Sequence, residues 1–171
     1  KSFESQGSWP HGTIIKPLPN VEFDADLVVF VEHKEGWEPK DYINKLASAL
    51  EGNKIYEGKL QRWSHCVTIH YAGERRIDVA PCVVGRRFID EYEVCNRDAN
   101  EFEPSNPTGY TKWVVEKNAV AGGNDLKKVT RLLKYMRDIK GNFTCPSFLL
   151  TTLLGNRINS WDKDSSELSD L

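Results

Sequence analysis

The sequence predicts an α/β fold, with a mixed, twisted sheet in its first part and helices after it. Residues 23–31 form an apolar stretch rich in valine, which is typical of a strand in the centre of a sheet. Residues 65–71 and 75–81 alternate polar and apolar side chains around a short turn, and this pattern predicts a β-hairpin. Apolar side chains elsewhere recur every three or four positions, which predicts amphipathic helices.

Length, composition and charge restrict the class of protein. The chain has 171 residues, of which 39% are apolar and 28% charged, as in folded domains rather than disordered segments. Its net charge of -2 gives no support for broad binding to long nucleic acid, which requires a strongly basic surface. No apolar run is long enough to cross a membrane. The four cysteines lack the short spacing of a structural zinc site, so we expect reduced thiols and a cytoplasmic protein.

Four helices are expected. The first begins at Pro39 and ends before Gly52, the second starts near residue 110, the third runs from a cap at Asn124 or Asp125 to Gly141, and the fourth has Pro146 in its first turn and runs to Leu154. Between residues 82 and 118 the regular patterns fade, and residues 96–108 are expected to form a loop. The change from strands to helices predicts a core over residues 1–120 and a second lobe over residues 121–171.

Acidic residues occur inside two of the predicted strands. Asp24 and Asp26 are two positions apart and therefore point to the same face of their strand. Two carboxylates at the start of an apolar strand repel each other and are costly to dehydrate, and a cation relieves that conflict. Their oxygen ligands suit Mg²⁺ better than zinc. Asp78 is a third acid within a core-like strand, although an ion pair with Arg75 or Arg76 is an equal alternative.

A glycine–serine pair precedes the first acidic strand. Gly7 lets the backbone approach a ligand closely, and Ser8 adds a hydroxyl beside free amides. Such a turn suits the outer phosphates of a nucleotide, although the dipeptide alone is common in proteins. A turn for phosphate and three acids for metal together favour a magnesium-dependent nucleotide site.

The motifs GSxxxGT, FDADLVV and RRIDVAP, with a proline-containing loop before the second of them, resemble the DNA polymerase β-like nucleotidyltransferase superfamily. Within it, the chain is most similar to the cGAS/DncV-like nucleotidyltransferases, the cyclic-oligonucleotide synthases of bacterial anti-phage signalling. The resemblance extends to the stretch PSNP with Tyr110 and Trp113, and to RLLKYMRD followed by CPSFLL. It implies the polymerase β-like nucleotidyltransferase core followed by part of a helical second lobe.

The resemblance also implies roles for particular residues. Gly7 and Ser8 match the pair that binds the donor triphosphate, and Asp24 and Asp26 match the first two metal ligands. Asp78 matches the third acid, which lies near the attacking ribose hydroxyl. Three further matches are nucleotide-binding residues of the second lobe: Lys134 and Ser147 for phosphate and Phe148, which replaces a tyrosine that stacks on the donor base. Each has a structural alternative, namely a solvated charge, a helix first turn and a core aromatic.

The implied reaction joins nucleoside triphosphates, ATP and also GTP or others, into a cyclic di- or trinucleotide second messenger with release of pyrophosphate. Mg²⁺ is the implied cofactor, with Mn²⁺ as an alternative ion, and a downstream effector recognises the product rather than the enzyme. Three rivals stay open: a linear-oligonucleotide synthase, a nucleotidyltransferase that modifies a macromolecule, and a non-catalytic nucleotide-binding module.

Several polar residues are assigned no catalytic role. His11 is expected to be a loop residue, and His65 and His70 do not make a zinc site with Cys66. Arg62, Arg86 and Arg87 are expected to be surface charges. The first six residues read as the tail of an element, and residues 161–171 as a polar end, so we expect the chain to be a piece of a larger protein.

Overall fold

A computed structural model describes residues 2–17, 23–88, 91–141 and 143–158 of the chain. They form two compact units. The first comprises Lys1–Gln6 and Pro17–Pro107, and the second comprises Gly7–Lys16 and Thr108–Leu171. Residues 18–20 of the predicted proline loop and the polar end at residues 161–171 lie outside the described residues. The predicted division into a core and a second lobe at residue 120 stays a prediction.

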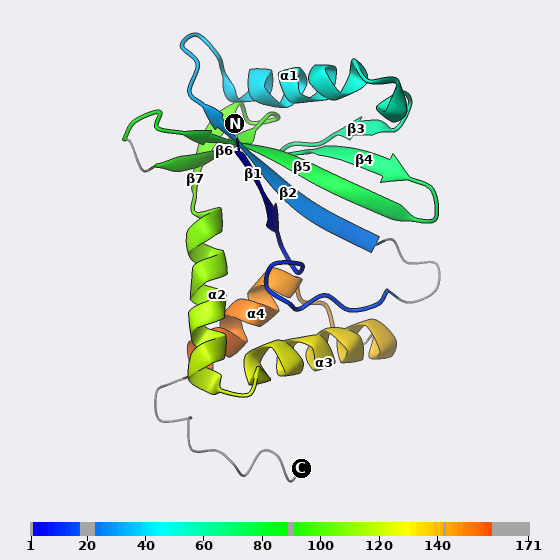
Figure 1. The fold of residues 1–171 in the computed structure, drawn as a ribbon, viewed down its shortest axis with the longest axis vertical. Helices are drawn as coiled ribbons and strands as arrows, with labels where there is room; N and C mark the ends of the chain where they lie inside the picture. The colour runs from blue at the N-terminus through cyan, green and yellow to red at the C-terminus, as the bar shows by residue number, and fades with distance from the viewer. Residues whose placement is uncertain (1, 18–22, 89–90, 142, 159–171) are drawn as a thin grey trace. The chain divides into compact units, whose positions relative to one another are not determined.

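The first unit contains a mixed sheet of seven strands in the part of the chain that the structure describes (Figure 1). The strands are β1 (Ser2–Gln6), β2 (Phe23–Glu32), β3 (Leu60–Arg62), β4 (Val67–Tyr71), β5 (Arg75–Val84), β6 (Tyr92–Asn96) and β7 (Glu101–Ser105). Their order is β1-β2-β5-β4-β3, with β6 paired to β5 and β7 paired to β6. Only β2 and β5 pair in parallel among these neighbours, and the predicted hairpin is β4 and β5.

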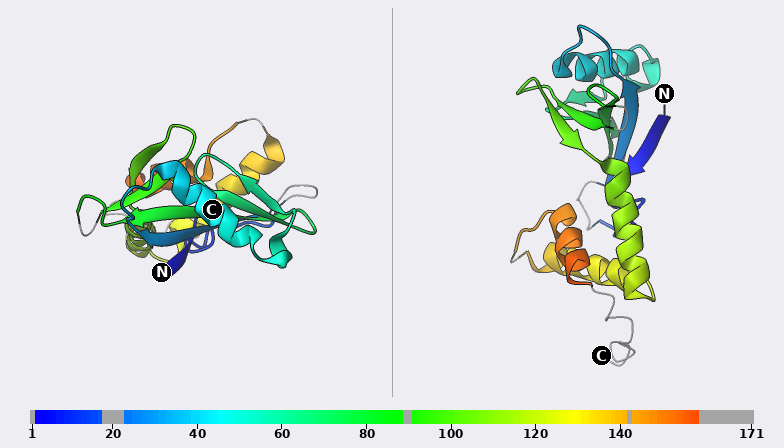
Figure 2. Two further views of the ribbon diagram at one scale, coloured as in Figure 1. Left: turned by 90° about the horizontal axis from the view of Figure 1, so that it is seen from above. Right: turned by 90° about the vertical axis from the view of Figure 1, so that its left-hand side faces the viewer.

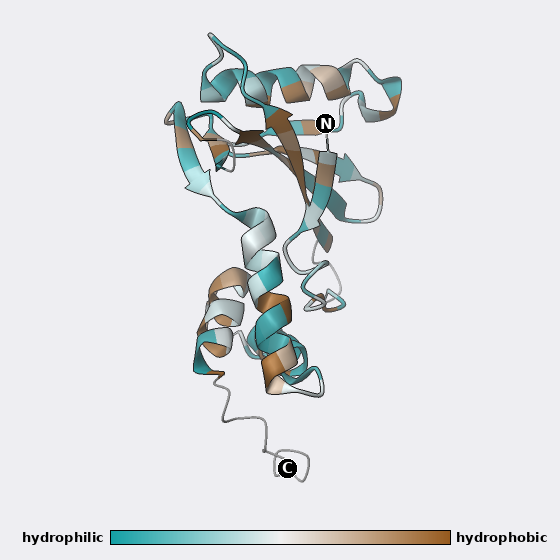
Figure 3. Cartoon of the chain, turned by 60° about the vertical axis from the view of Figure 1, so that its left-hand side comes forward, coloured by the Kyte–Doolittle hydropathy of each residue, from teal (hydrophilic) through white to brown (hydrophobic). Residues whose placement is uncertain are grey.

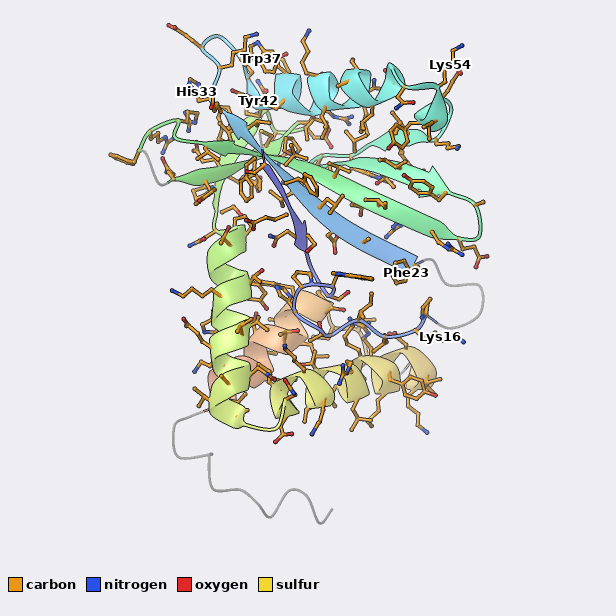
Figure 4. All side chains as sticks on the ribbon, in the orientation of Figure 1. Lys16, Phe23, His33, Trp37, Tyr42 and Lys54 are labelled. Carbon is orange, nitrogen blue, oxygen red and sulfur yellow. The ribbon has the colours of Figure 1, made fainter. Side chains whose placement is uncertain are left out.

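Helix α1 (Pro39–Glu51) lies across one face of this sheet, as Figures 1 and 2 show. Its buried side chains meet valines of the sheet in a core built around Tyr42, Ile43, Val67 and Val83. The hydrophobic colouring of the central strands in Figure 3 reflects that core. Tyr42 and Trp37, labelled in Figure 4, contact each other edge to face with ring centroids 5.2 Å apart. Alternation along the strands therefore assigns one face to α1 and leaves the other for the polar positions.

Strand β7 lies within a segment that the sequence predicts to be a loop. β6 and β7 pair antiparallel, so the expectation of a loop over residues 96–108 is wrong for Glu101–Ser105. The chain reverses at Asn100, which adopts the left-handed conformation at φ 57°. β7 contains Pro104 and three acidic or polar residues, a composition that does not predict a strand. Its pairing with β6, rather than the local sequence, stabilises it.

The second unit contains α2 (Pro107–Ala121) from its second residue on, together with α3 (Asp125–Lys140) and α4 (Ser147–Arg157). The third predicted helix has the expected ends, because Asn124 stands at its N-cap and Gly141 closes it at φ 61°. Asn124 does not cap with its side chain. Its Oδ1 instead accepts a hydrogen bond from Asn118 Nδ2 of α2 at 3.0 Å.

α2 and α4 both extend further than the sequence predicts. α4 continues to Arg157, past the predicted end at Leu154. Gly155 explains the continuation, because a Cβ there would come within 2.5 Å of the Trp113 ring on α2. The glycine permits close packing between the two helices instead of ending one of them. No helix among the described residues is long and apolar enough to cross a membrane.

Candidate functional site

The three predicted acids lie on one face of the sheet in the first unit. β2 and β5 are parallel neighbours, and their register sets Asp26 opposite Asp78 and Asp24 opposite Arg76. Because side chains alternate along a strand, all four residues point away from the face that packs on α1. The sequence assigned these acids to strand faces, and the pairing of β2 with β5 brings the two strands side by side.

Arg76 forms an ion pair with Asp24. Its Nε lies 2.7 Å from Oδ1, and its Nη2 donates a hydrogen bond to Oδ2 at 2.9 Å. Both side chains are partly open to solvent, with 35% of Arg76 and 45% of Asp24 exposed. The sequence offered Arg75 or Arg76 as an ion-pair partner for Asp78, and the structure pairs Arg76 with Asp24.

Asp78 is bound to the neighbouring strand β4. Thr68 Oγ1 donates a hydrogen bond to Asp78 Oδ1 at 2.5 Å, and Thr68 itself is fully buried. Because χ1 of a β-branched residue is restricted, the buried hydroxyl of Thr68 fixes the direction in which the carboxylate points. Sequence reasoning missed this residue, since only the pairing of Thr68 with Asp78 in the register reveals it.

The same acids affect the pKa of the Cys66 thiol. Burial raises the pKa of its thiol to about 11, and the negative charges of Asp78 and Asp26 act in the same direction. The thiol is therefore protonated at neutral pH. His70 contacts Gln61 and His65 contacts Glu103, and the expectation that these histidines make no zinc site with Cys66 stays a prediction.

The donor chemistry of this face fits Mg²⁺ better than zinc. Asp26 and Asp78 offer carboxylate oxygens from adjacent strands, and Asp24 lies two positions from Asp26 on the same face. Among the described residues, no three histidine, cysteine, aspartate or glutamate side chains are gathered as a metal-binding group. Asp24 faces Arg76, so it would have to turn from the guanidinium to join the other two acids.

The Gly-Ser turn belongs to the second unit and begins a loop over residues 7–16. Gly7 and Gly12 have φ angles of 68° and 63°, which only glycine adopts without strain. The loop closes on itself because the amide of Thr13 donates to the carbonyl of Ser8 and that of Gly12 to Trp9, both at 3.0 Å. These bonds explain the spacing of the GSxxxGT motif.

Basic side chains of α3 hold this loop. Lys134 Nζ donates to the carbonyl of Thr13 at 2.9 Å, and Arg131 Nη1 donates to that of Gly12 at 3.2 Å. Lys127, one turn earlier, lies against Gly12. Lys134 is only 6% exposed, so the alternative that it is a solvated charge is wrong.

His11 is buried rather than exposed within the loop, at 6% exposure. Its Nε2 lies 3.2 Å from Thr111 Oγ1 of α2, and its ring meets the edge of Tyr110 with centroids 5.2 Å apart. Burial, followed by the charges of Lys127 and Lys134, lowers the pKa of His11 below its ordinary value. This burial could not be predicted from the sequence, because a histidine in a polar turn belongs to no periodic pattern.

Ser147 and Phe148 begin α4. Ser147 Oγ accepts a hydrogen bond from Arg137 Nη1 at 3.2 Å, so it binds a side chain of α3. Phe148 is 63% exposed, which rules out the alternative of a core aromatic. Its ring packs on Tyr110 with centroids 4.7 Å apart. The nucleotide-binding roles of both residues stay predictions.

The arginines expected at the surface divide into two groups. Arg62 forms an exposed ion pair with Glu51 at 2.8 Å, in agreement with a surface charge. Arg86 is different, because it donates two hydrogen bonds to the buried carboxylate of Glu93 and lies over the Phe102 ring. Arg86 therefore neutralises a buried acid, and the expectation of a simple surface charge is wrong for it.

Comparison with known proteins identifies the family. Residues 1–118 match the model of the Second Messenger Oligonucleotide or Dinucleotide Synthetase domain, abbreviated SMODS. The chain belongs to the SMODS family. This confirms the resemblance to cGAS/DncV-like nucleotidyltransferases and the fold that it implies. The matched residues include the Gly-Ser turn and all three acids.

A curated relative and solved structures extend this SMODS assignment. A c-di-GMP synthase of Roseivirga ehrenbergii is 30% identical over 113 residues, which are 65% of this chain and 30% of the relative. The CD-NTase CdnG of Bradyrhizobium diazoefficiens, solved with GTP, matches with a TM-score of 0.74 at 19% identity, over 99% of this chain and 60% of that one. The DncV cyclic AMP-GMP synthase of Vibrio cholerae matches with a TM-score of 0.72 at 21% identity, over 99% and 48%.

These matches carry different weight. The two structural likenesses lie below 25% identity and show the fold alone. The SMODS chain spans 30% of the curated relative's length and 60% or less of these two solved chains. What the longer relatives make or bind therefore enters only as a basis for the proposal that follows.

Proposed function

We propose that this SMODS protein is a magnesium-dependent nucleotidyltransferase of the cytoplasm that joins nucleoside triphosphates into a cyclic di- or trinucleotide second messenger. The observation that carries the proposal is the position of Asp24, Asp26 and Asp78 on one face of adjacent strands in a chain of this family. The names of its relatives, a c-di-GMP synthase and a cyclic AMP-GMP synthase, support a cyclic dinucleotide product.

The chemistry proposed is attack by a ribose hydroxyl on the α-phosphorus of a nucleoside triphosphate. The new bond joins the ribose oxygen to phosphorus, the bond from phosphorus to the β-bridging oxygen breaks, and pyrophosphate leaves with that electron pair. The proton of the hydroxyl passes to a carboxylate oxygen of Asp78, which Thr68 orients. A second, identical transfer within the linear intermediate closes the ring of a dinucleotide, and a trinucleotide requires a third.

Asp24, Asp26 and Asp78 are the residues that would hold Mg²⁺, with Mn²⁺ as a substitute. The bound ion supplies charge neutralisation at the phosphoryl group and lowers the pKa of the attacking hydroxyl. Gly7 and Ser8 position the outer phosphates of the donor through backbone amides and a hydroxyl. Lys134 keeps the loop that carries them in place, and Phe148 offers an exposed ring for the donor base.

The substrates proposed are ATP with GTP or another nucleoside triphosphate as the second unit. Solved relatives were captured with GTP and with analogues of ATP and UTP, which supports triphosphates as a class. An effector that recognises the product would act downstream, in anti-phage signalling as the resemblance implies.

The deciding experiment incubates the full-length protein with all four ribonucleoside triphosphates and Mg²⁺ and then treats the products with phosphatase. Products that resist phosphatase are expected, because a cyclic product has no terminal phosphate. Chains that phosphatase degrades would instead establish the linear synthase, and label found only on protein or RNA would establish the macromolecule-modifying enzyme. Bound nucleotide without any turnover would establish the non-catalytic module.

A further inference from the structure

Asp24, one of the three acids proposed to bind metal, forms an ion pair with the side chain of Arg76. The two residues lie opposite each other in the parallel register of β2 and β5, on the face that carries Asp26 and Asp78. Three carboxylates on one face of a sheet repel each other, and a guanidinium among them reduces that repulsion. The positive charge of Arg76 therefore reduces the repulsion among the three carboxylates.

The contact involves both oxygens of Asp24. Arg76 Nη2 donates a hydrogen bond to Oδ2 at 2.9 Å, and Nε lies within ion-pair distance of Oδ1 at 2.7 Å. A divalent cation needs oxygen lone pairs of the same carboxylate, and its charge repels that of the arginine. The guanidinium and the cation therefore compete for Asp24.

The pair is also weak enough to be exchanged. Asp24 and Arg76 are 45% and 35% exposed, and ion pairs with that access to solvent contribute about 0–1 kcal/mol. We infer that Arg76 is the resident counter-ion of Asp24, which a divalent cation displaces when it binds the three acids. This inference rests on the proposed function, because it takes the acids as metal ligands.

The test measures binding of Mn²⁺ alone to the full-length protein, by electron paramagnetic resonance of the free ion, without nucleotide. Arg76→Gln is expected to tighten Mn²⁺ binding roughly two- to fivefold, the range of a partly exposed ion pair. Arg76→Lys, which keeps the charge and loses the planar fork, is expected to give an intermediate affinity. If Arg76 had a purely structural role, replacing it would not increase the affinity of the protein for Mn²⁺.

Arg75→Gln is the matched control. Arg75 is the preceding residue of β5, carries the same charge and is exposed, but alternation places it on the opposite face of the sheet. It is expected to leave Mn²⁺ affinity unchanged within about 1.5-fold, since screening weakens a charge that does not contact the acids. If Arg75→Gln tightened Mn²⁺ binding as much as Arg76→Gln, the change in net charge alone would explain the effect, and the inference would be wrong.

Asp26→Asn separates the inference from the proposed function. If Asp26→Asn abolishes Mn²⁺ binding while Arg76→Gln leaves it unchanged or weaker, the acids bind metal and the inference about Arg76 is wrong. If Asp26→Asn does not affect Mn²⁺ binding, or if the wild-type protein binds no Mn²⁺, the metal site of the proposed function fails and the inference fails with it.

Discussion

The acids of the first unit and the loop of residues 7–16 in the second are held in different ways. Asp24 is 45% exposed and pairs with the partly exposed Arg76, while the carboxylate of Asp78 accepts from the buried hydroxyl of Thr68. In the loop the charged and titratable side chains are themselves buried, because Lys134 from α3 and the loop's own His11 are each only 6% exposed. Exposed charges contribute little to folding but much to ligand binding, whereas buried polar contacts are costly to lose.

This difference predicts which measurement responds to each substitution. Changes at the acids should alter metal binding and product formation while leaving the free energy of unfolding nearly the same. Changes at the buried loop contacts should lower the free energy of unfolding. They should weaken nucleotide binding only because the loop is less stable. Four substitutions test this division, from the largest expected effect to the smallest.

Asp26→Asn is expected to have the largest effect. It should reduce the rate of product formation on the order of a thousandfold, because the loss of a metal ligand removes several kcal/mol of charge stabilisation in the transition state. The melting temperature should not fall, since the substitution also relieves repulsion among the acids. Rates of nucleotide incorporation and thermal unfolding check both parts.

Asp98→Asn is the control for that experiment, because Asp98 is an exposed acid on the turn after β6, paired with Arg97. It should change neither quantity. Full product formation by the Asp26→Asn protein would remove the metal assignment of that face altogether.

Thr68→Val is expected to weaken metal affinity and product formation by about 10- to 100-fold, the usual cost of losing a residue that orients a metal ligand. Valine keeps the volume and the β-branch but removes the donor to Asp78 Oδ1. Thr68→Ser, which keeps the hydroxyl, should restore most of the affinity. A serine variant as impaired as the valine variant would mean that packing, rather than the hydrogen bond, matters at this position.

Lys134→Met moves the test to the loop. The substitution leaves the carbonyl of Thr13 without its donor, and we expect the free energy of unfolding to fall by about 1–3 kcal/mol. Chemical denaturation measures this directly. Lys128→Met, on the same helix but exposed and paired with Asp125, should cost less than about 0.5 kcal/mol. Equal losses for the two variants would contradict the idea that buried contacts hold the loop.

The sequence could predict the acidic face better than the loop, for a physical reason. Strands repeat every two residues, so alternation alone assigns Asp24, Asp26 and Asp78 to faces. What alternation cannot supply is register, and only the pairing of β2 with β5 shows that Asp26 meets Asp78 and Arg76 meets Asp24. Thr68 was missed for the same reason, because its partner is fixed by the pairing of β4 with β5.

The loop and the strand at Glu101–Ser105 were harder to predict, because tertiary contacts determine both. His11 and Lys134 look like polar side chains in the sequence, and their burial follows from partners about a hundred residues away. β7 contains a proline and two glutamates, so its local preference is not for a strand. Pairing with β6 overrides that preference.

Substitution of His11 has the smallest expected effect, and its effect on the free energy of unfolding depends on pH. Burial lowers the pKa of His11 in the folded protein, so the unfolded chain, with an ordinary pKa near 6.5, binds the proton more readily. The contribution of His11 is therefore complete above about pH 6.5 and is lost as the pH falls from that value through the lower pKa of the folded protein. The slope it adds is at most about 1.4 kcal/mol per pH unit.

The measurement is the free energy of unfolding between about pH 7.5 and pH 5.5 for wild type and His11→Gln, whose difference isolates this histidine from the other titrating groups. The variant should lose less stability than the wild type on acidification. If the His11→Gln protein loses as much stability as the wild type on acidification, His11 accepts a proton without cost, and the loop is not held by a neutral, buried imidazole bonded to Thr111.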